Sequence, residues 1–98
     1  MEAGVASLVE LVQRIWATVL ELPDVGPEDD FFDLGGDSIA GLRVAAEVAA
    51  ALDLSAEDTE DLYAELFESP TARMFAEAIR AVANDVDRPS ELHRSDAT

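Results

Sequence analysis

The chain has 98 residues, of which 22 are acidic and 6 are basic, so its formal net charge is −16. This length suits one small domain with a single core, and the charge excludes nucleic acid and anionic membranes as partners because both need clustered Lys and Arg. The absence of cysteine excludes disulfides, thiolate metal sites and cysteine nucleophiles.

The first predicted element is an amphipathic helix over residues 7–22, SLVELVQRIWATVLEL. Ser7, with Glu10 three residues later, fits a capping box, and Pro23 prevents continuation of the helix. Trp16 lies next to the apolar stripe, so we expect it at the edge of the core. The stripe has the three- and four-residue steps of a helix and consists of Leu8, Leu11, Val12, Ile15, Val19 and Leu22.

Residues 23–37, PDVGPEDDFFDLGGD, are predicted to form a long loop because they hold two prolines and three glycines without a sustained period. Loops of this length in small domains usually carry function. Phe31, Phe32 and Leu34 are too apolar for a free linker, so we expect at least one aromatic ring to fix the loop to the core. The order of the carboxylates does not fit an EF-hand, and we expect no metal site.

A second helix is predicted in DSIAGLRVAAEVAAALDL, starting at Ser38 or one residue to either side. The two preceding glycines allow positive φ in the turn, and Asp37 can cap the first amides. Arg43 and Glu47 form an exposed pair four residues apart. The side chains expected to face the core are Ile39, Leu42, Ala45 or Ala46, Ala49 and Leu52.

A third, shorter helix is predicted within residues 55–68. Ser55 with Asp58, or alternatively Thr59, offers a start, as expected where a side-chain oxygen caps the first amides. Its short apolar face is formed by Leu62, Leu66 and Phe67.

A fourth helix is predicted to begin in SPTARMFAEAIRAV, with Ser69 or Thr71 as its cap and Pro70 in its first turn. Residues 84–98 have no apolar period, and we expect them to form a disordered tail. The side chains of the fourth helix expected to face the core are Met74, Phe75, Ala78, Ile79 and Val82.

These elements predict an all-α fold, a small four-helix bundle with a long first loop, because no segment alternates as a strand does. The folded domain is expected to span residues 1–83. No apolar run approaches the roughly 20 residues of a membrane span, and the N-terminus lacks a signal-peptide pattern. We therefore expect a cytoplasmic protein, and a monomer.

Ser38 is predicted to stand at the N-terminal end of the second helix, where unpaired amides and the helix dipole favour a phosphate. It could act only as a helix cap. As a nucleophile it would need a general base and an oxyanion site, but the sole histidine, His93, lies in the expected tail and no Gly-x-Ser-x-Gly motif is present. In a third interpretation Ser38 is a passive acceptor that another enzyme modifies.

The motif DDFFDLGGDSI, residues 29–39, resembles the signature of phosphopantetheine-binding carrier proteins. Its two glycines are more similar to the peptidyl carrier branch than to the fatty-acid branch. Leu42 and Arg43 follow at the spacing of that family, and LFESPT, residues 66–71, resembles the entry into its last helix. The resemblance covers about residues 8–82.

The resemblance implies a four-helix carrier that is not itself catalytic, with Ser38 as the attachment residue for 4′-phosphopantetheine. A separate phosphopantetheinyl transferase takes this arm from coenzyme A, and the arm then holds an aminoacyl or acyl group as a thioester. Asp37, Ile39, Leu42 and Arg43 are implied contacts for partners. The implied partners are an adenylating or loading enzyme and downstream condensation or tailoring enzymes of non-ribosomal peptide or related natural-product biosynthesis.

Acidic residues flank Ser38 on both sides in sequence, and we hypothesise that they steer basic partner surfaces. One departure from the family is the segment 52–68, LDLSAEDTEDLYAELFE, which is longer and more acidic than expected. We expect a free-standing carrier. The alternatives are an acyl or aryl carrier of polyketide or starter-unit pathways, and an unmodified acidic helical interaction module.

Overall fold

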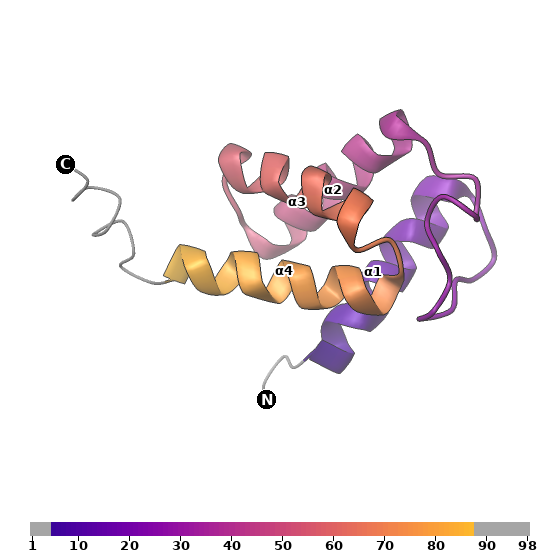
Figure 1. The fold of residues 1–98 in the computed structure, drawn as a ribbon, viewed down its shortest axis with the longest axis horizontal. Coiled ribbons are helices and arrows are strands. Elements are labelled where there is room, and N and C mark those ends of the chain that lie inside the picture. The colour runs from indigo at the N-terminus through magenta and orange to yellow at the C-terminus, as the bar shows by residue number, and fades with distance from the viewer. Residues whose placement is uncertain (1–4, 88–98) are drawn as a thin grey trace.

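The computed structural model describes residues 5–87, and within them the chain forms four helices (Figure 1). The α1 and α3 helices each pack against both α2 and α4. Apart from one isolated antiparallel bridge between Asp30 and Thr71, the described residues contain no strand pairing. The predicted four-helix bundle with a long first loop is therefore confirmed. The helices are α1 (Val5–Leu20), α2 (Ser38–Leu52), α3 (Ala56–Glu68) and α4 (Ala72–Asp87).

The α1 helix begins and ends two residues earlier than the sequence suggested. Ser7 lies inside α1, so the expected capping box at its start is wrong. The helix ends at Leu20 because Glu21 adopts a left-handed conformation with φ of 60°. The amide of Leu22 then donates to the carbonyl of Ala17 at 2.8 Å, which closes the helix end.

Trp16 lies at the centre of the core, with no exposed surface, and not at its edge as expected. Val9, Val12 and Trp16 form the buried face of α1, while Ile15 and Val19 are only partly buried. This face is rotated relative to the predicted stripe because α1 packs on both α2 and α4.

A short turn joins α2 and α3. It ends α2 and supplies the N-terminal cap of α3. Asp53 adopts a left-handed conformation after α2, with φ of 60°. The hydroxyl of Ser55 accepts from the amide of Asp58 at 3.1 Å, and the Asp58 carboxylate accepts from the amide of Ser55 at 3.2 Å. This capping box confirms the first of the two predicted starts for α3.

The α4 helix begins at Ala72, and Pro70 lies before it, not in its first turn. Thr71 is the cap, because its hydroxyl accepts from the amide of Met74 at 3.1 Å. The helix continues to Asp87, so residues 84–87, expected at the start of a tail, are helical. Residues 88–98, where the remaining tail and His93 fall, lie outside the described residues. Across residues 5–87 no helix combines the length and apolarity needed to cross a membrane.

The loop between α1 and α2 is fixed to the core by Phe31, as predicted for one of its aromatic rings. Phe31 is fully buried, and its ring meets that of Trp16 edge-on, with the centroids 5.0 Å apart. The amide of Phe31 donates to the carbonyl of Pro70 at 2.8 Å. The loop is therefore held both by packing against α1 and by a backbone bond to the α3–α4 turn.

Gly36 completes this anchor, because its amide donates to the carbonyl of Phe31 at 3.0 Å and its Cα faces the Phe31 ring. A Cβ at Gly36 would overlap that ring. Only Gly35 takes a positive φ, of 100°, so the predicted use of the two glycines for positive φ holds for Gly35 and not for Gly36. Gly36 is needed because it has no Cβ and so leaves room for the Phe31 ring.

Gly36→Ala is expected to lower the free energy of unfolding by about 1–3 kcal/mol, because the added methyl displaces a ring that is packed on all sides. Urea unfolding followed by helical circular dichroism measures the change. Gly26→Ala is the matched control, since its Cβ would meet only the exposed Asp29 side chain, 3.3 Å from Oδ2. An equal loss in both variants would contradict this account of Gly36.

Candidate functional site

The first turn of α2 is built by Asp37, which is the N-cap predicted from the sequence. Its backbone is extended, with φ of −129°, and its Oδ1 accepts from the amide of Ala40 at 2.9 Å. Its carbonyl accepts from the amide of Gly41 at 2.8 Å, the first bond of the helix. Asp37 therefore holds the helix end in place, and its carboxylate is engaged by the backbone.

Ser38 follows as the first residue of α2 and is exposed. Because Asp37 already caps the helix, the hydroxyl of Ser38 is not needed for that purpose, which removes the cap-only interpretation. The first amides of a helix point outward without intrahelical partners and carry the positive end of its dipole. A phosphodiester on the Ser38 oxygen fits this position, because Ser38 is exposed and the first amides of a helix favour an anion.

Ile39 and Leu42 are both exposed, at 71% and 51% of their surface, although the helical pattern placed them toward the core. The buried face of α2 instead consists of small or branched residues, Gly41, Val44, Ala45, Val48 and Ala49. This face lets α2 lie close to its neighbours. The two large apolar side chains remain near Ser38 on the outside, where a partner could contact them.

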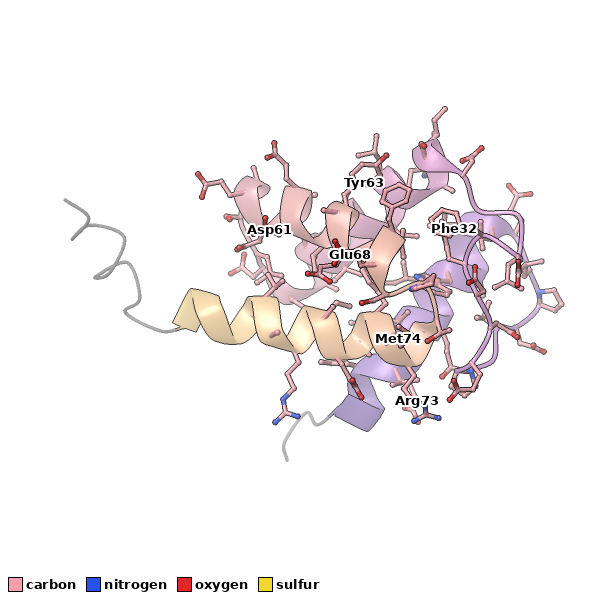
Figure 2. The ribbon with its side chains drawn as sticks, in the orientation of Figure 1. Phe32, Asp61, Tyr63, Glu68, Arg73 and Met74 are labelled. Carbon is pink, nitrogen blue, oxygen red and sulfur yellow. The ribbon has the colours of Figure 1, made fainter. Side chains whose placement is uncertain are left out.

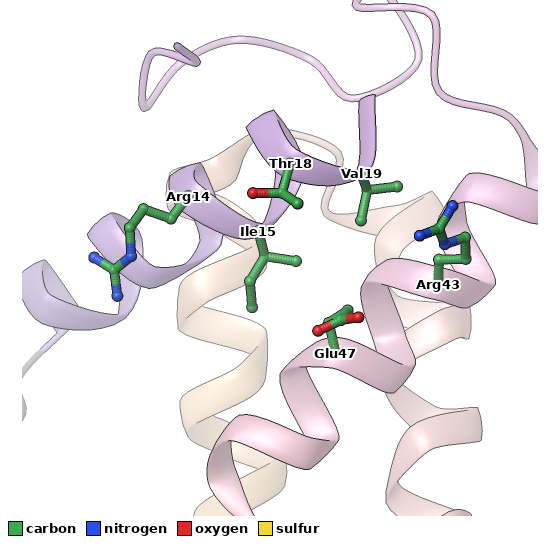
Figure 3. A pocket seen from close by; sticks show the side chains of 6 residues that line it. All are labelled: Arg14, Ile15, Thr18, Val19, Arg43 and Glu47. Atoms are coloured by element: carbon green, nitrogen blue, oxygen red, sulfur yellow. The ribbon is translucent and has the colours of Figure 1, made fainter. Parts of the chain in front are cut away.

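Arg43 lies apart from these side chains, in a groove of about 210 Å³ between α1 and α2. Figure 3 shows Arg43 and Glu47 on the α2 wall and Arg14, Ile15 and Val19 on the α1 wall. Arg43 and Glu47 share the groove without forming an ion pair, so the expected pairing is wrong. Among the described side chains of residues 7–83, the ion pair found joins Arg73 and Glu28, at 2.6 Å on the exposed surface.

Three aromatic side chains near the start of α2 were not predicted as part of the site. The rings of Phe32 and Phe67 are stacked with centroids 5.3 Å apart, and Tyr63 meets Phe67 edge-on at 5.1 Å. Phe67 is 47% exposed, although the sequence placed it in the core. We call Phe32, Tyr63 and Phe67 the aromatic shelf. The i, i+4 spacing of Tyr63 and Phe67 was the signal available in the sequence.

Carboxylates dominate the surface around the site. Figure 2 shows Asp61 near the middle of α3 and Glu68 at its C-terminal end, on the helix that also carries Tyr63. Among the side chains that the structure describes, those of residues 7–83, no group of acidic residues is arranged to hold a metal ion. The acidic residues of α3 are Glu57, Asp58, Glu60, Asp61, Glu65 and Glu68.

Comparison with known proteins connects this geometry to a family. Residues 10–79 match the family described as "Phosphopantetheine attachment site". The chain is 36% identical to surfactin synthase subunit 2 of Bacillus subtilis over 85% of its own length and 2% of that protein. It is 40% identical to polyketide synthase PksN of the same organism over 74% of its length and 1% of that protein. The chain therefore spans only a small fraction of these curated relatives.

A solved structure with the same fold is that of BlmI, a type-II acyl carrier protein from Streptomyces verticillus involved in bleomycin biosynthesis. The TM-score is 0.70 and the sequence identity is 26%, over 81% of this chain and 89% of that one. This similarity covers most of both chains.

Asp37→Ala is expected to lower the free energy of unfolding by about 0.5–2 kcal/mol, because the first amides of α2 lose their cap. Asp37→Asn keeps a side-chain oxygen at the same place and is expected to lose much less. Urea unfolding of both variants distinguishes capping from a charge effect. Equal losses in the two variants would show that the carboxylate charge, and not the hydrogen bond, stabilises this turn.

Proposed function

Because the chain belongs to the family of carrier proteins with a phosphopantetheine attachment site, we propose that Ser38 is its attachment residue. The supporting observation is that Ser38 is exposed at the first position of α2 while Asp37 takes over the capping of that helix. The protein is a carrier of the type found in non-ribosomal peptide and polyketide synthases, and its cofactor is covalent 4′-phosphopantetheine.

Each residue of the turn has a separate part in this proposal. The Ser38 oxygen forms the bond to phosphorus while the nucleotide half of coenzyme A leaves, and the serine proton passes to the transferase. Asp37 caps the helix, because its Oδ1 accepts from the amide of Ala40. The outward amides of α2 hold the resulting phosphodiester. The thiol at the end of the arm carries an aminoacyl or acyl group as a thioester.

We propose that the chain holds the arm and presents the attached group to other enzymes, and that it does not itself catalyse a reaction. Its proposed partners are a phosphopantetheinyl transferase, an adenylating or loading enzyme, and condensation or tailoring enzymes. Asp37, Ile39, Leu42 and Arg43 are proposed partner contacts. Of these, Ile39 and Leu42 form an exposed apolar pair beside Ser38, whereas Arg43 would be reached from the α1 side. A cytoplasmic location is part of the proposal because coenzyme A is supplied there.

A second candidate is a carrier for polyketide or starter-unit acyl groups, which the similarity to polyketide synthase PksN supports. The two candidates share the attachment chemistry and differ in the loading enzyme. Incubation of the modified protein with aminoacyl-adenylating and acyl-transferring enzymes would distinguish them.

The full chain, incubated with coenzyme A, Mg²⁺ and a broad-specificity phosphopantetheinyl transferase, is expected to gain the mass of one phosphopantetheine. Ser38→Ala should show no gain while its circular dichroism is unchanged. Ser7→Ala, which alters an exposed serine on α1, serves as the matched control and should be modified normally. A folded wild-type protein that gains no mass would leave the unmodified interaction module as the better explanation.

Transferase kcat/KM is expected to fall roughly tenfold or more as ionic strength rises from about 0.01 to about 1 M, which shortens the Debye length from about 30 to about 3 Å. The reason is that the acidic surface attracts a basic partner. A double variant, Glu60→Gln with Asp61→Asn, should react more slowly than wild type at low salt and equally at high salt. Rates that do not depend on salt would rule out steering by these carboxylates.

A further inference from the structure

The groove between α1 and α2 is a surface that the proposed attachment chemistry does not use. Figure 3 shows Ile15 and Val19 between the two arginines, Arg14 on one side and Arg43 on the other. Its volume of about 210 Å³ is below the roughly 300–1,000 Å³ of sites that enclose a small molecule. The groove is therefore of a size to receive side chains of a protein segment. The residues that line it are Arg14, Ile15, Thr18, Val19, Arg43 and Glu47.

The α1 wall of the groove is apolar because the fold leaves part of the apolar stripe of α1 uncovered. Ile15 and Val19 belong to that stripe and are only partly buried. They are four positions apart, so they lie above one another at a rise of about 6 Å. This spacing matches two apolar side chains one turn apart on another helix. On the α2 wall the exposed Ala46 stands beside Glu47, and its small side chain leaves room for a close approach.

The charge of the groove is opposite to that of the chain as a whole. Its lining holds two arginines and one glutamate, whereas the chain has 22 acidic and 6 basic residues. Arg14 and Arg43 are exposed, and neither forms an ion pair among the described side chains of residues 7–83. Two guanidinium groups beside an apolar wall are complementary to a segment that carries carboxylates next to apolar side chains.

The groove faces away from Ser38. Arg43 follows Ser38 by five positions, and because each residue turns the helix by about 100°, the two side chains are about 140° apart around α2. The groove also lies on the α1 side of α2, while α3 packs elsewhere on that helix. A protein bound in the groove therefore leaves Ser38 accessible to a second protein.

We propose that the α1–α2 groove is a docking site for an amphipathic helix of a partner protein, one whose apolar stripe is flanked by Asp or Glu. The apolar side chains of that helix contact Ile15 and Val19, and its carboxylates pair with Arg14 and Arg43. The groove thus prefers an acidic partner, although the rest of the surface attracts basic ones. The inference does not depend on modification of Ser38.

Three synthetic peptides test this preference. Each has about 18 residues, enough for a helix to form, and carries the same leucine stripe flanked by Glu, by Gln or by Lys. The full chain is labelled with ¹⁵N-arginine, and the side-chain Nε–H signals of Arg14 and Arg43 are assigned by their loss in Arg14→Lys and Arg43→Lys. Titrations are made at an ionic strength of about 0.15 M, where a Debye length of about 8 Å screens long-range repulsion between protein and peptide.

The Glu peptide is expected to shift the signals of Arg14 and Arg43 saturably and to leave that of Arg73, which is paired with Glu28, in place. The Gln peptide should bind roughly tenfold more weakly, and the Lys peptide should not shift Arg14 or Arg43. Arg43→Gln should weaken binding of the Glu peptide severalfold. Arg80→Gln is the matched control, because it removes the same charge from an exposed position on α4 and should not weaken binding.

Three results would overturn the inference: no saturable shift with the Glu peptide up to about 1 mM, equal shifts of Arg14 and Arg43 with the Glu and Lys peptides, or equal losses in Arg43→Gln and Arg80→Gln. Shifts that depend on protein concentration without peptide would assign the groove to a second copy of the chain and would also overturn it. Ser38 should still be modified by the transferase when the Glu peptide is saturating, and a block would contradict the separation of the two faces. Absence of modification without peptide would overturn the proposed function alone.

Discussion

The contact between Phe31 and Trp16 is the interaction on which the position of Ser38 depends. The long α1–α2 loop is also held by the buried side chain of Val25 and by the bond from the amide of Arg73 to the carbonyl of Pro27 at 2.9 Å, but these contacts lie further along the chain from Ser38. Phe31 enters the core beside Trp16, and its backbone bonds to both Pro70 and Gly36. One buried residue therefore connects the core, the α3–α4 turn and the start of α2.

The same constraint explains how a small domain can present the proposed attachment serine without enclosing it. Here the turn is rigid because Gly36 packs against Phe31 and Asp37 caps α2, while Ser38 itself remains exposed. A carrier needs this combination, because several different enzymes must reach the same arm.

The α2 helix has small side chains on its buried face and large apolar ones on its exposed face. Gly41, Ala45 and Ala49 allow the helices to approach closely, and Tyr63 and Leu66 pack over the bare Cα of Gly41. Larger apolar side chains lie at the surface, namely Leu42 on α2 and Phe67 on α3. The bundle therefore combines a closely packed interior at α2 with exposed apolar side chains on α2 and α3.

The sequence by itself determined the four helices, the long loop, the cap at Asp37 and the start of α2 to within one residue of Ser38, because these depend on local spacing and on backbone chemistry. It also carried the motif of the family. Only the tertiary structure decided which side of each helix faces the core. It placed Trp16 at the centre of the core and left Ile39, Leu42 and Phe67 exposed. A helical pattern gives an apolar stripe but not its exact centre, which is set by two neighbouring helices at once.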